Sequence, residues 1–537
     1  MNPNFCKQVR KFFYLIGALL LSSCGSSAAI IAAPIENIDL IPLKEKELTD
    51  AEEKEWSHLD LITDTIPGVS LHKAYEELVK SKSKTIIVAV IDSGIDIDHE
   101  DLKGNIWVNA DEVPNNGKDD DGNGYVDDIN GWNFLGGANN EQLEYVRLVA
   151  SGNTSNPRYA EAQELLSKEH EKTSQNKEQY EGILTQLITS NTAIIAHLNN
   201  PNYTKEDVEA IFTPDWDVLR HVRIIKQSYG FGFDSIKALI DDLETGLKTF
   251  KTRLNYNLNI DYDGRTIVGD NPDDFNDRDY GNSDVRAKNG RTHGTHVSGI
   301  IAAKRHNSIG INGAANNVKI MAIRNTPSGD EYDKDVALGV YYAVDNGAKV
   351  INMSFGKQFS PHSDWVRDAI AYASKNDVLI VAAAGNEAQN TDKINYFPND
   401  QINNGDEVSN TFLKVGSNGP KYGSTLVAGY SNYGKNTVDI FAPGSQIYST
   451  YPKNSYEFAS GTSMAAPLVA GIAALIFSQY PGLSATQVKQ ILMTSGVAIN
   501  KKVVLENGRI EPFSELSKTG KLVNAYNALL MASKLSK

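Results

Sequence analysis

Cysteine is almost absent from this chain of 537 residues: only Cys6 and Cys24 occur, both close to the N-terminus. We therefore expect no disulfide bond in the folded protein. An excess of positive charge is also missing, because 52 basic and 67 acidic residues give a net charge of −15. This balance argues against nucleic acid as a partner, since such binding rests on neutralising phosphates. The remaining composition, with 41% hydrophobic residues, is typical of a globular protein with a large core.

The N-terminal apolar stretch, Phe12–Leu21, follows three basic residues and is too short to cross a bilayer comfortably, as in a signal peptide. The residues Leu21-Ser22-Ser23-Cys24 resemble a bacterial lipobox, which implies cleavage before Cys24 and attachment of lipid to its thiol. An ordinary signal peptide that contains a cysteine is the alternative. We expect residues 1–23 to be a lipoprotein signal peptide and residues 24–55 a tether. The mature protein would then be extracytoplasmic and anchored to a bacterial membrane, at the outer membrane or cell surface rather than freely secreted.

Two continuous apolar stretches predict parallel strands that are covered on both faces, and each leads into polar residues. Thr85–Ile91 ends at Asp92, and Asp377–Ala384 ends at Gly385 and Asn386. Open α/β sheets place their sites at the carboxyl ends of parallel strands, so Asp92 and Asn386 are candidate site residues. The sequence therefore predicts an α/β fold with a doubly wound, mostly parallel sheet.

Two helices rich in small residues are predicted to begin at a histidine and near a serine. One starts at His293, and the other places Ser463 directly ahead of the apolar stretch Leu468–Ile476. A hydroxyl there lies over unpaired N–H groups and the positive end of the helix dipole, although serine is also a common N-cap. With Asp92, these residues supply the carboxylate, base and nucleophile of a Ser-His-Asp triad, in the chain order Asp, His, Ser.

Several segments resemble motifs of the subtilisin-like (subtilase) serine proteases, over residues 80–135 and 260–535. They are Val90–Asp96, His293–Gly299, Ala383–Asn386 and Gly461–Pro467, with weaker support from Asn352–Gly356 and Phe441–Gly444. The resemblance implies a serine endopeptidase in which Asp92 orients the base and His293 is the general acid and base. It likewise implies that Ser463 is the nucleophile and that Asn386 lines the oxyanion hole.

The same resemblance implies polypeptide substrates, which would lie as an extended strand beside Ser354, Phe355 and Gly356. We expect a monomer. Two other functions stay open at this point: a catalytically inactive subtilase fold used for binding, and a metallohydrolase built on His293 and His296. Two histidines three residues apart, without a third ligand nearby, are more typical of a structural role.

An acidic loop predicts a structural calcium ion, Ca2+. Asp119, Asp121 and Asn123 match positions 1, 3 and 5 of a calcium loop, Gly124 gives the sharp turn, and the Tyr125 carbonyl falls at position 7. Position 12 is asparagine rather than glutamate, so Asp127 or Asp128 would have to complete the ligand shell. A solvated acidic turn is the alternative. By resemblance to the family, Asp101 and Asn307 would be side-chain ligands of a second calcium ion.

The spacing between Asp92 and His293 is much longer than subtilases usually have, and the excess falls at residues 140–258. Helical periodicity is predicted within it at Tyr159–Lys172, Gln179–Leu198, Lys205–Phe212 and Phe233–Leu254. We therefore predict a helical insertion, 140–258, in a catalytic domain formed by residues 56–139 and 259–537. The insertion could restrict access to the site, bind a partner, or be surface decoration. It could also replace the inhibitory pro-domain that many secreted subtilases carry, because Gly25–Lys84 shows no alternating strands of the kind that such a domain would have.

Overall fold

The computed structural model describes residues 33–536, apart from residues 37, 41, 42, 45, 82, 289, 403 and 404. The predicted signal peptide and Cys24 lie outside the described residues. The chain divides into two units, Met1–Ile35 and Glu36–Lys537, and the fold described below is that of the second unit.

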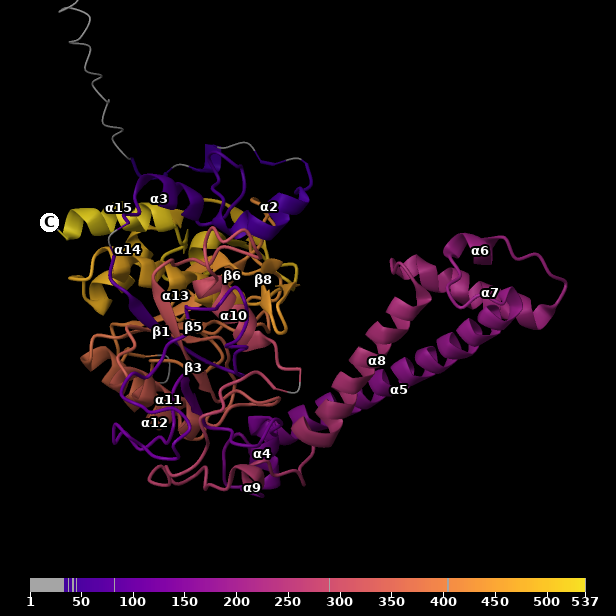
Figure 1. The fold of residues 1–537 in the computed structure, drawn as a ribbon, viewed down its shortest axis with the longest axis horizontal. Coiled ribbons are helices and arrows are strands. Elements are labelled where there is room, and N and C mark those ends of the chain that lie inside the picture. The colour runs from indigo at the N-terminus through magenta and orange to yellow at the C-terminus, as the bar shows by residue number, and fades with distance from the viewer. Residues whose placement is uncertain are drawn as a thin grey trace, which may run out of the picture. The chain divides into compact units, whose positions relative to one another are not determined.

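A nine-stranded sheet forms the centre of the fold (Figure 1). Its strand order is β10-β13-β7-β6-β5-β4-β1-β3-β2, and every pair is parallel except β10 with β13. In that order the strands are Val497–Ala498, Lys521–Leu522, Ile440–Pro443, Phe412–Asn418, Leu379–Ala383, Val350–Met353, Ile86–Asp92, Val318–Arg324 and Gly131–Asn133. This arrangement confirms the predicted mostly parallel α/β sheet.

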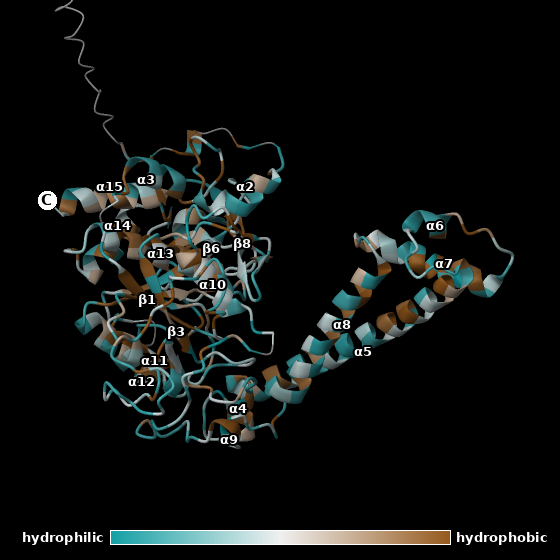
Figure 2. Cartoon of the chain, in the orientation of Figure 1, coloured by the Kyte–Doolittle hydropathy of each residue, from teal (hydrophilic) through white to brown (hydrophobic). Residues whose placement is uncertain are grey.

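Helices cover both faces of this sheet. Alternate residues of β1, such as Ala89 and Ile91, share one core cluster with α11 (Asp333–Asp345) and α12 (Ser363–Lys375). Helix α13 (Thr462–Gln479) contacts strands β1 and β4 to β7, and it also packs against α10 (His293–Ala302). Because successive side chains of a strand point to opposite faces, β1 is buried from both sides, which explains its continuous apolar sequence (Figure 2).

Helix α13 is the one helix of the described residues that is long and apolar enough to cross a membrane by length and composition. Its most apolar window is 89% buried within the protein. Helix α13 is therefore a core helix that packs on the sheet.

The remaining elements surround this core. They are two antiparallel hairpins, β8 (Ile447–Tyr451) with β9 (Ser455–Ala459) and β11 (Lys502–Val504) with β12 (Ile510–Pro512), and the helices α14 (Ala485–Ser495), α15 (Ala525–Leu535) and η5 (Phe513–Glu515). The N-terminal part adds η1 (Ile38–Leu40), α2 (Asp50–Glu55), η2 (Trp56–His58) and α3 (Leu71–Glu77).

Part of the predicted tether, 24–55, packs on the body of the protein. The Tyr422 hydroxyl donates to Asp39 at 2.5 Å. Directly after α2, Trp56 is 1% exposed and its indole N–H reaches the carbonyl oxygens of Ser445 and Gln446 at 3.1 and 3.2 Å. These contacts tie the segment ahead of the sheet to the loops that follow β6 and β7.

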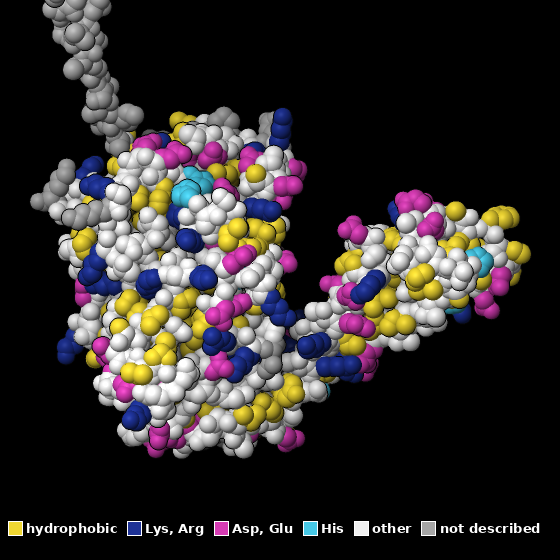
Figure 3. Space-filling view, in the orientation of Figure 1, with side chains coloured by type: hydrophobic (Ala, Val, Ile, Leu, Met, Phe, Trp, Pro, Cys, Tyr) yellow, Lys and Arg dark blue, Asp and Glu magenta, His cyan; other side chains and the backbone are white. Residues whose placement is uncertain are grey.

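Residues 144–257 form a helical arm (Figure 1). It consists of α4 (Glu144–Ala150), α5 (Tyr159–Leu198), α6 (Lys205–Glu209), α7 (Trp216–Ser228), η3 (Tyr229–Phe231), α8 (Ile236–Thr252) and a π-helical turn, η4 (Arg253–Asn257). The short helix α9 (Arg265–Val268) follows the arm and belongs to the body. The arm has its own apolar cluster, which includes Leu187, Ile194, Val222 and Leu239. Charged side chains of both signs cover its surface near the body (Figure 3).

The arm differs from the sequence prediction in two places. Tyr159–Lys172 and Gln179–Leu198 belong to one continuous 40-residue helix, α5. The polar residues that join them have no apolar periodicity, but they contain no glycine or proline, and Lys177 among them pairs with Glu181 one turn later at 3.1 Å. Helix α7 was not predicted, although Asp215 caps it through the N–H groups of Asp217 and Val218.

Candidate active site

Asp92 and His293 meet at the carboxyl edge of the sheet, although 201 positions separate them in the chain. Asp92 is the last residue of β1, and His293 is the first residue of α10. His293 Nδ1 lies 2.8 Å from Asp92 Oδ1 and 2.9 Å from Oδ2. The Asp92 side chain is 1% exposed, while 39% of the His293 side chain remains accessible. The ring is therefore held by a buried carboxylate on one edge and keeps an accessible surface.

The charge of Asp92 favours the protonated form of His293. Burial lowers the pKa of His293, but the charge and hydrogen bond of Asp92 outweigh it and leave the pKa above its usual value of 6.5. Gly294 permits this approach of α10 to β1: a Cβ there would lie 2.4 Å from the Gly94 carbonyl oxygen and 3.2 Å from Asp92 Oδ1. The glycine after the histidine is thus required by packing.

Ser463 lies in the first turn of α13, as the sequence predicts, and is 9% exposed. Its hydroxyl donates to the carbonyl oxygen of Ser354 at 2.9 Å. The hydroxyl proton is therefore directed at Ser354 and not at the His293 ring. Rotation about the Cα–Cβ bond of a serine moves its hydroxyl between staggered positions without any change of the backbone.

Asn386 follows β5 and faces the start of α13. Its Oδ1 accepts from the N–H of Thr462 at 2.9 Å and from the Thr462 hydroxyl at 3.1 Å, which fixes the amide group. A Cβ built on Gly461 would lie 3.5 Å from both Asn386 Nδ2 and the backbone nitrogen of Ser463. Two N–H donors therefore border the same small space beside the serine.

The segment Ser354–Gly356 continues from β4 towards the same place. The Ser354 hydroxyl donates to the carbonyl oxygen of Ser463 at 2.9 Å, so the two serines are joined in both directions. Gly356 accepts from the Tyr396 hydroxyl at 3.1 Å, and a Cβ there would lie 2.4 Å from the Tyr396 ring. Phe355 is 9% exposed. The segment is held against both the serine and the loop after β5.

His296 is 2% exposed and, within the described residues, makes no contact of the kind expected of a metal ligand pair with His293. Its Nε2 lies 3.1 Å from the carbonyl oxygens of Ile447 and Glu457, on the two strands of the β8–β9 hairpin. Burial lowers the pKa of His296 to about 4, so the ring is neutral and donates from Nε2. These contacts favour a structural role for His296.

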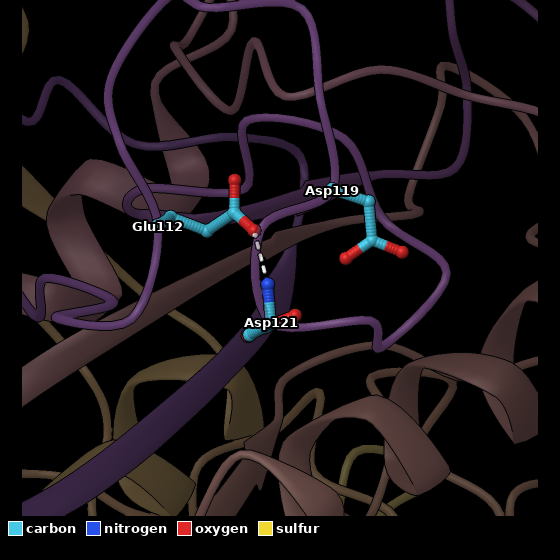
Figure 4. A group of neighbouring side chains, drawn as sticks. All are labelled: Glu112, Asp119 and Asp121. Atoms are coloured by element: carbon cyan, nitrogen blue, oxygen red, sulfur yellow. Dashed lines mark hydrogen bonds between the residues drawn. The ribbon is translucent and has the colours of Figure 1, made fainter.

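The acidic loop brings together Glu112, Asp119 and Asp121, whose carboxylate oxygens lie within 4.8 Å of one another (Figure 4). Sequence reasoning missed Glu112, which is 5% exposed. Glu112 Oε1 accepts from the N–H groups of Asp120 and Asp121 at 2.7 and 3.2 Å, while Oε2 has no hydrogen-bond partner among the described residues. A buried carboxylate oxygen without a partner beside two further carboxylates is suited to a cation.

Asp128 closes the other side of this loop through amide groups. It is fully buried, which raises its pKa, and it accepts from the Tyr342 hydroxyl at 2.5 Å and from Asn123 Nδ2 at 3.1 Å. Asn109 Nδ2 bridges Asp128 and Asp121 at 2.8 and 2.9 Å. The ring of Tyr125 packs edge-on against Tyr342, with centroids 4.9 Å apart.

The second predicted calcium pair also meets. Asn307 Nδ2 donates to Asp101 Oδ1 at 2.7 Å, and the N–H of Ile311 donates to Oδ2 at 3.1 Å. Asp101 is fully buried, and burial raises its pKa. These contacts bring the residues together without deciding what they bind.

The model of the subtilase family matches residues 83–512. The chain belongs to the subtilase family. It is 36% identical over 259 residues to the thermophilic serine proteinase of Bacillus sp. (strain AK1), 39% over 212 residues to thermitase of Thermoactinomyces vulgaris, and 36% over 236 residues to subtilisin DY of Bacillus licheniformis. These alignments cover 48%, 39% and 41% of this subtilase, and 58%, 69% and 76% of the relatives. The family assignment places the enzyme in the class of serine-type endopeptidases.

Proposed function

We propose that this subtilase hydrolyses peptide bonds with Asp92, His293 and Ser463 as its catalytic triad. The observation that carries the proposal is the contact of His293 Nδ1 with both oxygens of the buried Asp92, at 2.8 and 2.9 Å. A buried carboxylate at Nδ1 holds the ring proton there, so that Nε2 is free to act as the base.

In this mechanism Ser463 Oγ turns from the Ser354 carbonyl and attacks the carbonyl carbon of the substrate while His293 Nε2 takes its proton. The negative oxygen of the tetrahedral intermediate accepts hydrogen bonds from Asn386 Nδ2 and the Ser463 N–H. His293 then protonates the leaving amine, and an acyl-enzyme forms on Ser463. Water, deprotonated by the same histidine, releases the acid and restores the serine.

The substrate is a polypeptide bound in extended form beside Ser354, Phe355 and Gly356. Support comes from the position of this segment, which continues from β4 and is joined to Ser463 by two hydrogen bonds of 2.9 Å. Main-chain pairing of this kind tolerates many sequences, because it uses groups that all peptides share.

The test is covalent labelling with a fluorophosphonate probe, together with cleavage of a denatured protein. Ser463→Ala should abolish both signals, whereas Ser533→Ala, in α15, should keep both. Absence of labelling in the wild-type protein would favour the alternative of an inactive fold used for binding. Cleavage that survives Ser463→Ala would favour a metallohydrolase.

We further propose that Ca2+ stabilises this enzyme at two places. Glu112, Asp119, Asp121, Asn123, the Tyr125 carbonyl and Asp128 would serve the first, with oxygen ligands of the type that calcium prefers. The unpartnered Glu112 Oε2 supports this site. Asp101 and Asn307 would serve the second, where the support is the hydrogen bond between Asn307 and the buried Asp101.

The cellular location is a separate proposal, which rests on the resemblance of residues 21–24 to a lipobox. Lipid on Cys24 would hold the enzyme on an extracytoplasmic membrane face. Cys24→Ala should move the protein from the membrane fraction to the soluble fraction and prevent labelling by a fatty-acid analogue, whereas Cys6→Ala should do neither.

A further inference from the structure

A cavity of about 750 Å³ lies where the helical arm joins the body of the enzyme. One wall comes from the arm, with Leu148 of α4 and Arg158 just before α5, and another comes from Phe359–His362 on the body. The loop Ile260–Asp263, which leads out of the arm, completes it. A volume of this size is that of a ligand-binding pocket rather than a packing defect.

The cavity continues directly from the segment proposed to bind substrate. Lys357 follows Gly356, and its backbone pairs with Phe397 through hydrogen bonds of 2.9 and 2.8 Å. Phe397 lines the cavity, and so does Phe359 two residues further along. Phe359 comes five positions after Ser354, which is at most about 17 Å of extended chain. A peptide bound beside this segment reaches the cavity within about five residues of the bond to be cleaved.

The arm holds this wall in place through polar contacts, some of them buried. Lys357 Nζ lies 2.8 Å from Glu144 of α4 and 3.0 Å from Asp333 of α11. Arg158 donates to the Gln358 carbonyl oxygen at 2.7 Å, and its guanidinium carbon lies 3.6 Å from the centre of the Phe359 ring. The arm is therefore part of the surface next to the substrate segment.

The charged groups around the cavity leave an excess of negative charge. Arg147 pairs with Glu144 at 3.2 Å, and Arg158 pairs with Glu161 at 2.8 Å, so both arginines are compensated. Asp261 and Asp263 take part in no ion pair among the described residues. The Asp263 carboxylate accepts hydrogen bonds only from neutral groups, which are the backbone N–H of Arg265 and the N–H and hydroxyl of Thr266. The Asp261 carboxylate accepts no hydrogen bond within the described part of the chain.

We propose that this cavity is a second recognition site for the polypeptide substrate, which receives a lysine or arginine side chain lying about four to six residues from the cleaved bond. The proposal rests on the proposed peptidase function and deepens it. The aromatic wall at Phe359 accommodates the aliphatic part of such a side chain, and Asp261 and Asp263 attract its charge. The helical arm thereby contributes to sequence selectivity.

Peptides that share one cleavable core test this proposal. A single lysine, or glutamine for comparison, is moved from two to eight residues away on either side of the cleaved bond. With the wild-type enzyme we expect lysine to raise kcat/KM about two- to fivefold at four to six residues, on one side only, as for a partly exposed ion pair. Asp261→Lys should abolish this preference and reverse it for glutamate, while Asp217→Lys, at an exposed site on α7, should leave it unchanged.

A second variant tests the cavity itself. Leu148→Trp fills it, so it should lower kcat/KM for the long peptides while the short core peptide is cleaved as by the wild type. That core peptide also reports folding. Equal rates for lysine and glutamine at every position, with normal cleavage of the core, would overturn the second site alone. Failure of the wild-type enzyme to cleave any peptide or to react with a fluorophosphonate would overturn the peptidase function, and the second site with it.

Discussion

Replacing Asp92 with asparagine changes one buried charge without changing the volume of the side chain. Asp92 Oδ1 accepts from the Ser93 N–H at 2.7 Å, so the amide oxygen of an asparagine would stay in that position. The amide NH2 would then occupy the Oδ2 position, 2.9 Å from His293 Nδ1. A donor at that place requires Nδ1 to be the acceptor, so the ring proton moves to Nε2. In that tautomer His293 has no lone pair facing the serine.

The expected loss of activity is large because this pair is shielded from water. Asp92 is 1% exposed, so water cannot take over the lost role of the carboxylate. Loss of the carboxylate in triads of this geometry lowers kcat by about 10⁴, which is about 5.5 kcal/mol in activation free energy. We expect a loss of that size for Asp92→Asn, with little change in melting temperature.

The assay is peptide hydrolysis followed in parallel with the rate of fluorophosphonate labelling. Asp98→Asn is the matched control, because Asp98 is 72% exposed and pairs only at the surface, with Arg286 at 3.2 Å. It should stay within about twofold of the wild-type rate. A folded Asp92→Asn enzyme with more than a tenth of wild-type activity would refute the assignment of Asp92 as the residue that orients the base.

Three other outcomes follow from the structure. Activity should rise with pH through an inflection above 6.5, because the facing carboxylate raises the pKa of His293 and only the neutral ring can take the serine proton; an inflection at or below 6.5 contradicts this. Chelation of calcium should lower the melting temperature, because a site at a calcium concentration of 100 times its Kd contributes about 2.7 kcal/mol of binding free energy to the folded state. Asp121→Asn and Asp101→Asn should each reduce this effect of the chelator, and an unchanged melting temperature counts against both sites. Trp56→Ala should lower the free energy of unfolding by about 3–5 kcal/mol, whereas Trp216→Ala, at a side chain 81% exposed, should change it by less than about 0.5 kcal/mol; equal changes in denaturant titrations would argue against the packing of the N-terminal segment.

The sequence predicted those parts of the site whose residues stand at the ends of regular elements. Continuous apolar residues mark β1 up to Asp92 and β5 up to the turn before Asn386, and both patterns come from burial on two faces. Small residues after His293 and around Ser463 mark helices that pack closely against the sheet. Local composition carries this information because each pattern reflects the immediate environment of its own segment.

Other parts of the site depend on contacts that no local pattern records. Glu112 reaches the acidic loop from seven residues before Asp119, across a turn, and no spacing rule includes it. The direction of the Ser463 hydroxyl depends on the carbonyl of Ser354, 109 positions away. The cavity beside the arm likewise arises from walls far apart in the chain. Such features follow from tertiary packing and are visible only once the elements are assembled.

One of the two hydrogen bonds between Ser354 and Ser463 is explained by a proline inside α13. Pro467 has no N–H, so the carbonyl oxygen of Ser463, four residues earlier, loses its helical partner. The Ser354 hydroxyl donates to that oxygen at 2.9 Å and so satisfies a buried acceptor. The gap in the helix therefore ties the backbone of the proposed nucleophile to the segment proposed to bind substrate. Because the serine hydroxyl returns a bond to Ser354 at 2.9 Å, a peptide bound beside this segment would lie next to the proposed nucleophile.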